Sequence, residues 1–350
     1  MITTDSFFAA QSQQKKQFIL GFSFLLLLFA VISLGYGPAG WDWRLSVAWL
    51  LPEYFNQFSD LQINVVTQIR LPRFILAIIV GAVLAQTGAA TQALCRNPLA
   101  DPSIIGISGG AAVMAVGVIA LAPKFGFNPE FYLPYAAFLG ALIVTMTVYQ
   151  FSKHNNEINV TSLILIGVAF NALAFALIGL FSFYADDSSL RLINYWTMGS
   201  LGGAGWSGMT LALPLIIISF VGLYLKRKEL NMMLLGEAEA RYMGVNIKRL
   251  KSQVIILVAL GIGSVVALSG MIGFIGLVVP HITRLLVGAN LQQMLGICAL
   301  LGGVVLLFSD WLAKIVVAPA ELPIGIITAL IGAPLFVYLL RRQNLGGDRA

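Results

Sequence analysis

Charged side chains are scarce in this chain of 350 residues. They make up 10% of the sequence, whereas hydrophobic side chains make up 59%. A soluble globular domain usually carries about 25% charged residues, so this composition excludes an ordinary soluble protein. The apolar residues form continuous runs, unlike the short alternating segments of a transmembrane barrel. The sequence therefore predicts an all-α integral membrane protein.

Cysteine is almost absent, with only two residues in the chain. Cys95 and Cys298 are far apart in sequence, and neither takes part in a CxxC or Cys/His spacing. This pattern predicts neither a disulfide framework nor a metal site.

Long apolar runs occur along the whole chain, and each approaches the roughly 20 residues that cross a bilayer as a helix. Ten spans with both termini in the cytoplasm place fifteen of the 21 basic residues on the cytoplasmic side, whereas nine spans would place twelve there. The positive-inside rule therefore favours ten. The expected helices are 18–36, 73–94, 103–122, 132–151, 161–184, 206–225, 253–269, 271–287, 294–312 and 323–340.

These spans divide the chain into a cytoplasmic segment at 1–17, a membrane domain at 18–340 and a cytoplasmic tail at 341–350. The first span is longer than the apolar part of a signal peptide, so we expect it to be retained. The basic residues lie mostly at span ends, where membrane topology explains the net charge of +6 without a nucleic-acid partner.

One loop, 226–251, concentrates the scarce charge: ten of its 26 residues are charged. Gly236 is suited to begin a short helix, Glu237 to its first turn and Gly244 to its end. So short a helix needs a surface to lie on, and the preceding LNMMLL offers an apolar face to a partner. The alternative is a solvated loop whose charges only enforce topology.

Six motifs, in order and at matching spacing, resemble the permease subunits of type II ABC importers for iron chelates, haem and cobalamin, the FecCD-type family. They are QIRLPR (68–73), RNPLADPSIIGISGGA (96–111), YWTMGSLGG (195–203), LNMMLLGEAEARYMGV (230–245), SGMIGFIGLVVPHITR (269–284) and APAELPIGIITALIGAPLF (318–336).

The resemblance implies the type II importer fold of ten helices in the bacterial inner membrane. It also implies three partners: a second permease subunit, expected to be an identical copy, an ABC ATPase dimer and a periplasmic binding protein. No cofactor is expected to be bound permanently, and ATP and Mg would be held by the ATPase. The chain has no Walker A pattern, so ATP must be bound by a separate subunit if it drives transport. This chain is therefore expected to be a transport subunit and no enzyme.

In this family the charged loop is the coupling element that rests in a cleft of the ATPase. The resemblance assigns this role to Gly236, Glu237, Ala240, Arg241 and Gly244.

The resemblance also implies sites at both ends of the pore. Arg70 and Arg73 would dock acidic residues of the binding protein, and snorkelling to lipid headgroups is the alternative. Lys314 would join them, although its spacing from Asp310 also suits a plain helix ion pair. The cytoplasmic gate would include the following residues: Asn97, Leu99 and Thr161.

The substrate is expected to be haem or a ferric siderophore, with cobalamin as the alternative. The pattern DDSSLRLINYWTMGSLG (186–202) looks more like the haem-uptake members. A structural role explains His281 more readily than haem ligation does. A secondary carrier is the rival class. The expected first seven spans contain no Asp, Glu, Lys, Arg or His apart from Arg73, which disfavours coupling to protons and leaves coupling to sodium open.

Overall fold

Helices form nearly all of the computed structural model, which describes residues 4–37, 40–47, 58–154 and 157–347. The long helices are α1 (Thr4–Gly35), α5 (Leu71–Cys95), α6 (Ile107–Phe125), α7 (Pro129–Phe151), α8 (Val160–Tyr184), α10 (Trp206–Leu225), α13 (Ile247–Ser269), α15 (Leu291–Ile315) and α16 (Ile324–Gly347). The shorter ones are α2 (Trp43–Val47), α4 (Asp60–Val65), α9 (Asp187–Thr197), α11 (Arg227–Met233), α12 (Glu237–Tyr242) and α14 (Ile275–Val287), with a π-helical turn at Val66–Arg70 and a 3-10 turn at Pro102–Ile105.

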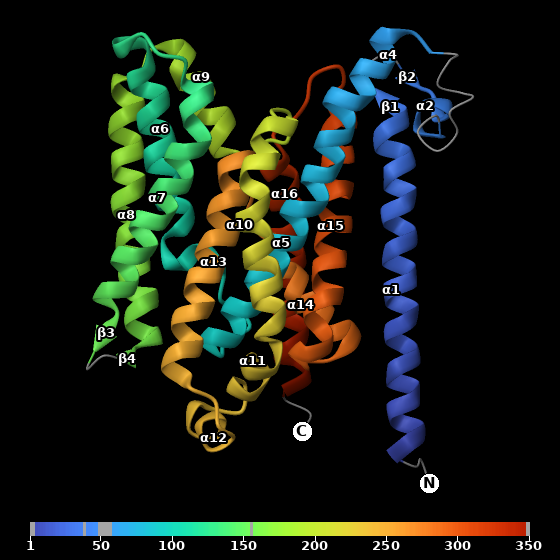
Figure 1. Ribbon diagram of the computed structural model, residues 1–350, viewed down its shortest axis with the longest axis vertical. Coiled ribbons are helices and arrows are strands. Elements are labelled where there is room, and N and C mark those ends of the chain that lie inside the picture. Colours follow the sequence, from blue (N-terminus) through green and yellow to red (C-terminus); the bar gives the residue numbers. More distant parts are fainter. Residues whose placement is uncertain (1–3, 38–39, 48–57, 155–156, 348–350) are drawn as a thin grey trace.

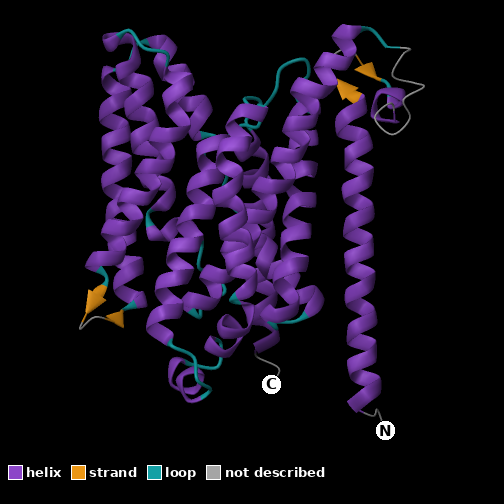
Figure 2. Ribbon diagram, in the orientation of Figure 1, coloured by secondary structure: helices purple, strands orange, loops and turns teal. Residues whose placement is uncertain are grey.

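Two small antiparallel hairpins are the described strands (Figure 2). The first pairs β1 (Tyr36–Gly37) with β2 (Gly40–Trp41), and the second pairs β3 (Lys153–His154) with β4 (Glu157–Ile158). Each lies in a link at an end of the helix bundle, and neither forms part of the core.

Within the described residues, eight helical segments are long and apolar enough to cross a membrane, and two shorter apolar helices accompany them. Each of the ten overlaps one predicted span, although some bounds differ. The start of α1 and the end of α16 lie at the same end of the bundle as α12 (Figure 1). That arrangement is what an even number of crossings requires.

The first two predicted spans are longer in the structure because polar residues continue each helix beyond its apolar run. α1 begins at Thr4, ahead of the predicted residue 18. The second span begins at Asp60, ahead of the predicted residue 73, where the Ser59 hydroxyl accepts from the Gln62 amide and the Gln62 side chain accepts from the Ser59 amide. This capping box fixes the start of the helix.

The predicted eighth span, 271–287, is wrong at its start, since α14 begins at Ile275. Residues 270–274 are non-helical and lie against two other loops, since Gly199 and Gly325 both lie close to Met271 O. Just before them, Ser269 O accepts from the Ser200 amide at 2.7 Å. Gly270 has φ +66° and lies too close to Trp196 O for any side chain. Irregular backbone at membrane depth is tolerated where it is buried in protein or lines a cavity, and these interlocked loops meet that condition.

The centre of the bundle is formed by α5, α13 and α15, which are largely buried, whereas α1, α8 and α10 are largely exposed. α5 and α15 approach closely because Gly81 and Gly302 face each other, and a Cβ at either would collide with the other backbone. Small residues at a helix contact let two backbones come together in a membrane. This central group connects the two ends of the molecule.

Candidate functional site

The charged loop 226–251 folds into α11 and α12 at one end of the bundle (Figure 1). As predicted, Gly236 is the N-cap of α12, with φ +131°, and Gly244 follows its end with φ +87°. Ala240 is fully buried on the inner face of α12. The loop is therefore a folded element that rests on the membrane domain.

Two ion pairs attach α12 to the bundle. The Glu237 carboxylate lies 2.8 Å from Lys251 Nζ in α13 and 3.8 Å from the Arg96 guanidinium at the end of α5. Lys251 is buried and also donates to Ile158 O at 3.0 Å. Arg241 pairs with Glu157 at 3.6 Å, and both side chains are exposed. Glu237 thus orients α12 from within the chain.

Only part of the apolar face predicted for LNMMLL is exposed and could contact a partner. Leu230 and Met233 are fully buried against the core, whereas Leu235 is 68% exposed. The exposed apolar surface continues onto Tyr242, which is 92% exposed, and Met243. The surface available to a partner therefore lies on the second half of the segment, around α12.

A second charged cluster lies at the opposite end of the bundle, between α5, α15 and the loop before α16. The Arg73 guanidinium lies 2.9 Å from Asp310 Oδ1 and 2.7 Å from Glu321 Oε2. Lys314 Nζ lies 2.7 Å from Asp310 Oδ2, which is the predicted helix ion pair. We call these four residues, Arg73, Asp310, Lys314 and Glu321, the outer quartet.

The outer quartet is largely closed to solvent. Arg73, Lys314 and Asp310 are nearly buried, and Glu321 is the most exposed member. Arg70 lies apart from it and donates to Leu34 O at 2.6 Å. The contacts of Arg73 with Asp310 and Glu321 were not predictable from the sequence, since both carboxylates lie more than 230 positions away along the chain.

The predicted gate residues lie at the same end of the bundle as α12, two in the link after α5 and one at the start of α8. Asn97 and Leu99 follow α5 and are exposed, and the Asn97 side chain accepts from the Leu99 amide at 2.9 Å. Thr161 is exposed in the first turn of α8, which Asn159 caps by accepting from the Ser162 amide at 3.1 Å.

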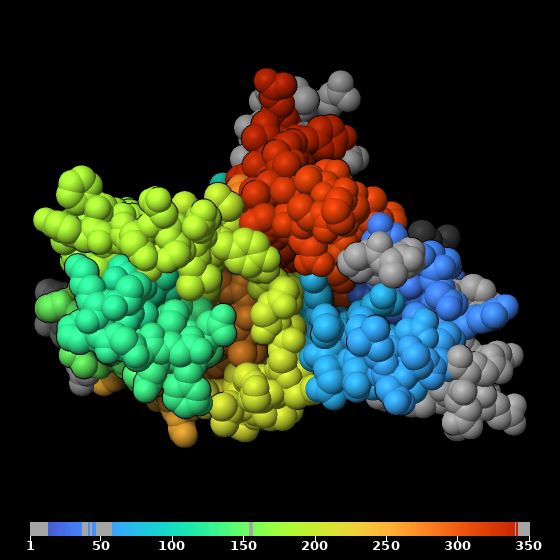
Figure 3. All heavy atoms as spheres, turned by 90° about the horizontal axis from the view of Figure 1, so that it is seen from above, coloured from blue at the N-terminus to red at the C-terminus, as the bar shows by residue number. Residues whose placement is uncertain are grey.

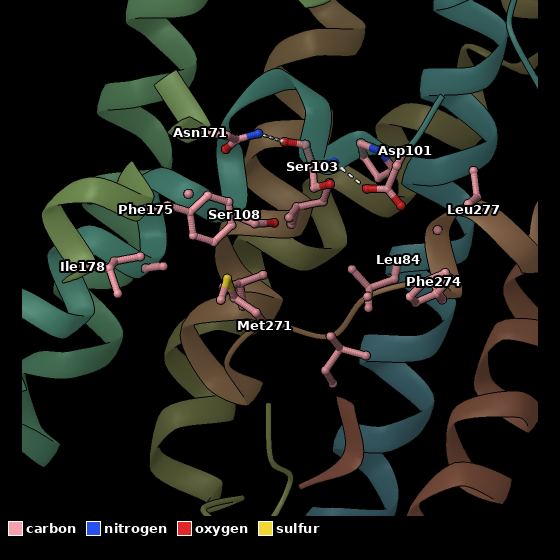
Figure 4. Close-up of a pocket in the computed structure, with 18 residues that line it drawn as sticks. Leu84, Asp101, Ser103, Ser108, Asn171, Phe175, Ile178, Met271, Phe274 and Leu277 are labelled. Carbon is pink, nitrogen blue, oxygen red and sulfur yellow. Dashed lines mark hydrogen bonds between the residues drawn. The ribbon is translucent and has the colours of Figure 1, made fainter. Parts of the chain in front are cut away.

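A cavity of about 390 Å³ lies between the 3-10 turn at Pro102–Ile105, α6, α8 and the non-helical residues 270–274 (Figure 4). Its polar side includes Asn171, which donates to Ser103 O at 3.0 Å, and Asp101, which accepts from the Ser103 amide at 2.8 Å. Through the last contact Asp101 caps the 3-10 turn at Pro102–Ile105. Met271 and Phe175 contribute an apolar side.

His281 is buried in α14, with 2% of its surface exposed. Among the residues that the structure describes, no three His, Cys, Asp or Glu side chains come together in a way that could hold a metal ion.

Among the described residues, eight helical segments are long and apolar enough to cross a membrane, which is the architecture of a multi-pass membrane protein. The sequence matches the FecCD transport family over residues 25–342. The chain belongs to this family, and it is a permease subunit of an ABC importer.

Individual relatives agree with this assignment. The chain is 41% identical over 324 residues to the hemin transport system permease protein HmuU of Yersinia pestis, a match that covers 92% of this chain and 95% of the relative. It is 37% identical over 345 residues to the vitamin B12 import system permease protein BtuC of Yersinia pseudotuberculosis, covering 98% of both chains. A solved metal-chelate type ABC transporter in an inward-facing conformation superposes with a TM-score of 0.82 at 35% identity, covering 93% of this chain and 99% of that one.

Proposed function

We propose that this permease imports an iron chelate, haem or a ferric siderophore, across a bacterial inner membrane, with α12 and both termini in the cytoplasm. The relative at 41% identity is named for hemin transport, which supports haem as the first candidate. The relative at 37% identity is named for vitamin B12 import and supports cobalamin as the second.

The energy source is ATP, bound with Mg by a separate ATPase dimer that docks on α12. The observation that carries this proposal is the construction of α12: it is tied inward by Glu237 and buried Ala240, while Leu235 and Tyr242 stay uncovered. Surface helices rarely leave large apolar side chains together in solvent unless a partner covers them. Arg241 and Gly244 flank this surface and complete the proposed contact.

The opposite end is the proposed docking site of a periplasmic binding protein. Arg70 and the outer quartet supply three cationic side chains there, with Lys314 as the third. Carboxylates of the binding protein would receive charge-assisted hydrogen bonds from them, which for Arg73 and Lys314 requires exchange of their partners within the quartet.

A second, identical permease subunit would complete the pore against the largely exposed face of α8. The proposed cytoplasmic gate comprises Asn97, Leu99 and Thr161 from each copy. The cavity beside Asn171 would then lie next to the transport path.

The coupling proposal is tested by Tyr242→Ala combined with Leu235→Ala in the full transporter. We expect loss of substrate-driven ATP hydrolysis and of ATPase co-purification, with an unchanged melting temperature of the permease. Leu213→Ala, at an exposed apolar position of α10 away from α12, is the matched control. Full ATPase retention in the double variant would contradict the proposed interface.

Substrate identity is tested by uptake of labelled haem, a ferric siderophore and cobalamin in cells with and without the permease. Loss of one signal on deletion identifies the substrate, and ATP depletion should abolish the same signal. Uptake that survives ATP depletion but collapses with the sodium gradient would favour a secondary carrier.

A further inference from the structure

A second hollow lies outside the proposed transport path, between α7 and α10. Its volume is about 710 Å³, and α13 forms its floor through Ser264, Ala267 and Leu268. Seen from above, the groove separates the green start of α7 from the yellow start of α10, with the orange of α13 below (Figure 3). We call it the α7/α10 groove.

The groove opens sideways toward the bilayer. Leu139 of α7 and Leu211 of α10 line it, and both are more than half exposed. In a helix bundle that spans a membrane, such apolar side chains face hydrocarbon. A volume of this size is within the range of about 300–1,000 Å³ that holds a small molecule.

The upper end of the groove lies at the level of the lipid headgroups. Phe131, Tyr132 and Tyr135 pack edge to face or tilted at the start of α7, with centroids 5.1 and 5.8 Å apart from Phe131. Aromatic clusters of this kind mark the membrane interface. Asn128 and Glu130 lie at the same level, just ahead of these rings.

Two polar groups on the groove have no partner in the part of the chain that the structure describes. The Ser264 hydroxyl is 1% exposed and makes no hydrogen bond there, although a buried hydroxyl normally has one. The Glu130 carboxylate is the one charged side chain among the lining residues and forms no ion pair with a described residue. Glu130 itself is exposed, so an occupant that pairs with both groups would carry a cation at the interface and a polar acceptor deeper in the groove.

We propose that the α7/α10 groove binds a phospholipid with a primary amine headgroup, such as phosphatidylethanolamine. The ammonium group donates to the Glu130 carboxylate, the Ser264 hydroxyl donates to an ester carbonyl, and an acyl chain fills the apolar space above α13. The site is independent of the transported substrate. Because α13 continues directly from the coupling loop, the lipid is positioned to influence how that helix moves.

The test uses full-length permease in nanodiscs that contain equal amounts of phosphatidylethanolamine and phosphatidylcholine. The protein is transferred to mild detergent, and native mass spectrometry measures the retained lipids. We expect phosphatidylethanolamine to be enriched about fivefold over phosphatidylcholine, because both headgroups carry a cation but only the primary ammonium can donate a charge-assisted hydrogen bond to Glu130.

Two variants, each with a control, test recognition of the lipid headgroup separately from binding of the acyl chain. Glu130→Gln should reduce the enrichment to about one while a lipid is still retained, and Asp187→Asn, an exposed first-turn carboxylate of α9, should not. Ala212→Phe should place a ring in the groove and remove the retained lipid, whereas Leu213→Phe, on the same helix outside the groove, should not. Melting temperatures identify any variant that misfolds.

The proposal is overturned if the wild-type protein shows no enrichment, or if Glu130→Gln keeps it. Equal lipid retention in Ala212→Phe and Leu213→Phe would also overturn it, because the lipid would then lie elsewhere on the surface.

Discussion

The two ends of the helix bundle use their few charges differently. At the α12 end, the pairs are mostly at the surface and hold a short helix in place while its apolar residues remain uncovered. At the other end, the outer quartet is nearly buried and joins α5, α15 and the loop before α16. The charges at the α12 end thus support an exposed surface, whereas those of the outer quartet hold three segments of the bundle together.

The difference follows from what a charge costs in each place. An exposed ion pair contributes up to about 1 kcal/mol, so it can orient a helix without fixing the fold. A buried charge that loses its partner costs about 3–5 kcal/mol, so the quartet must stay complete. Substitutions in the outer quartet should therefore lower stability strongly, whereas those of exposed charges at the α12 end should change stability little.

The largest effect is expected for Asp310→Asn. Both Arg73 and Lys314 lose an anionic partner, and the two cations remain together in a nearly buried place. We expect a loss of about 3–5 kcal/mol in the free energy of unfolding, measured by denaturation in detergent. Asp60→Asn, at an exposed helix start, is the control. A loss below about 1 kcal/mol would show that the quartet is open to water.

Lys251→Met tests a buried charge at the α12 end. Glu237 would keep only the longer contact to Arg96, and we expect a loss of about 2–3 kcal/mol in stability. Lys248→Met, at an exposed position of the same helix, should change little. Exchange of the two charges in Lys251→Glu with Glu237→Lys should restore part of the loss if the pair itself is responsible.

Glu321→Gln removes the most exposed charge of the outer quartet. Arg73 keeps Asp310, so we expect a smaller loss, at most about 1–2 kcal/mol. Denaturation of this variant beside Asp310→Asn ranks the two carboxylates. An equal loss in the free energy of unfolding in both variants would show that Glu321 contributes as much to the outer quartet as Asp310 does.

Arg241→Gln should have the smallest effect on stability, below about 1 kcal/mol, because its pair with Glu157 is long and exposed. If α12 docks the ATPase, the same variant should nevertheless lower substrate-driven ATP hydrolysis. A loss of stability with unchanged ATP hydrolysis would show that Arg241 has a structural role and would contradict its part in ATPase docking.

Much of the fold was predictable from the sequence because the bilayer imposes simple rules. Apolar run length and the distribution of basic residues predicted ten helices, with only the start of the eighth misplaced, and capping residues predicted the bounds of α12. Hydrogen bonds from Ser189 and Ser188 also lower the pKa of the Asp186 carboxyl, which lies outside the spans.

The contacts that complete the sites were not predictable in the same way. Arg73 meets Asp310 and Glu321, and Lys251 meets Ile158 O, only because distant helices pack side by side. Hydropathy reports whether a residue is in the membrane, but it does not report its neighbours. The start of α14 was missed for a related reason: residues 270–274 are as apolar as a helix, and their conformation is set by the loops against which they lie.

That interruption has a mechanical consequence. α13 has 23 residues and is therefore about 35 Å long. It is fastened to α12 at one end by Lys251, and at the other it ends where the backbone is no longer helical, beside the cavity. A stiff rod held at its base and jointed at its tip acts as a lever, so a small tilt imposed at α12 would be delivered as a displacement of the cavity wall.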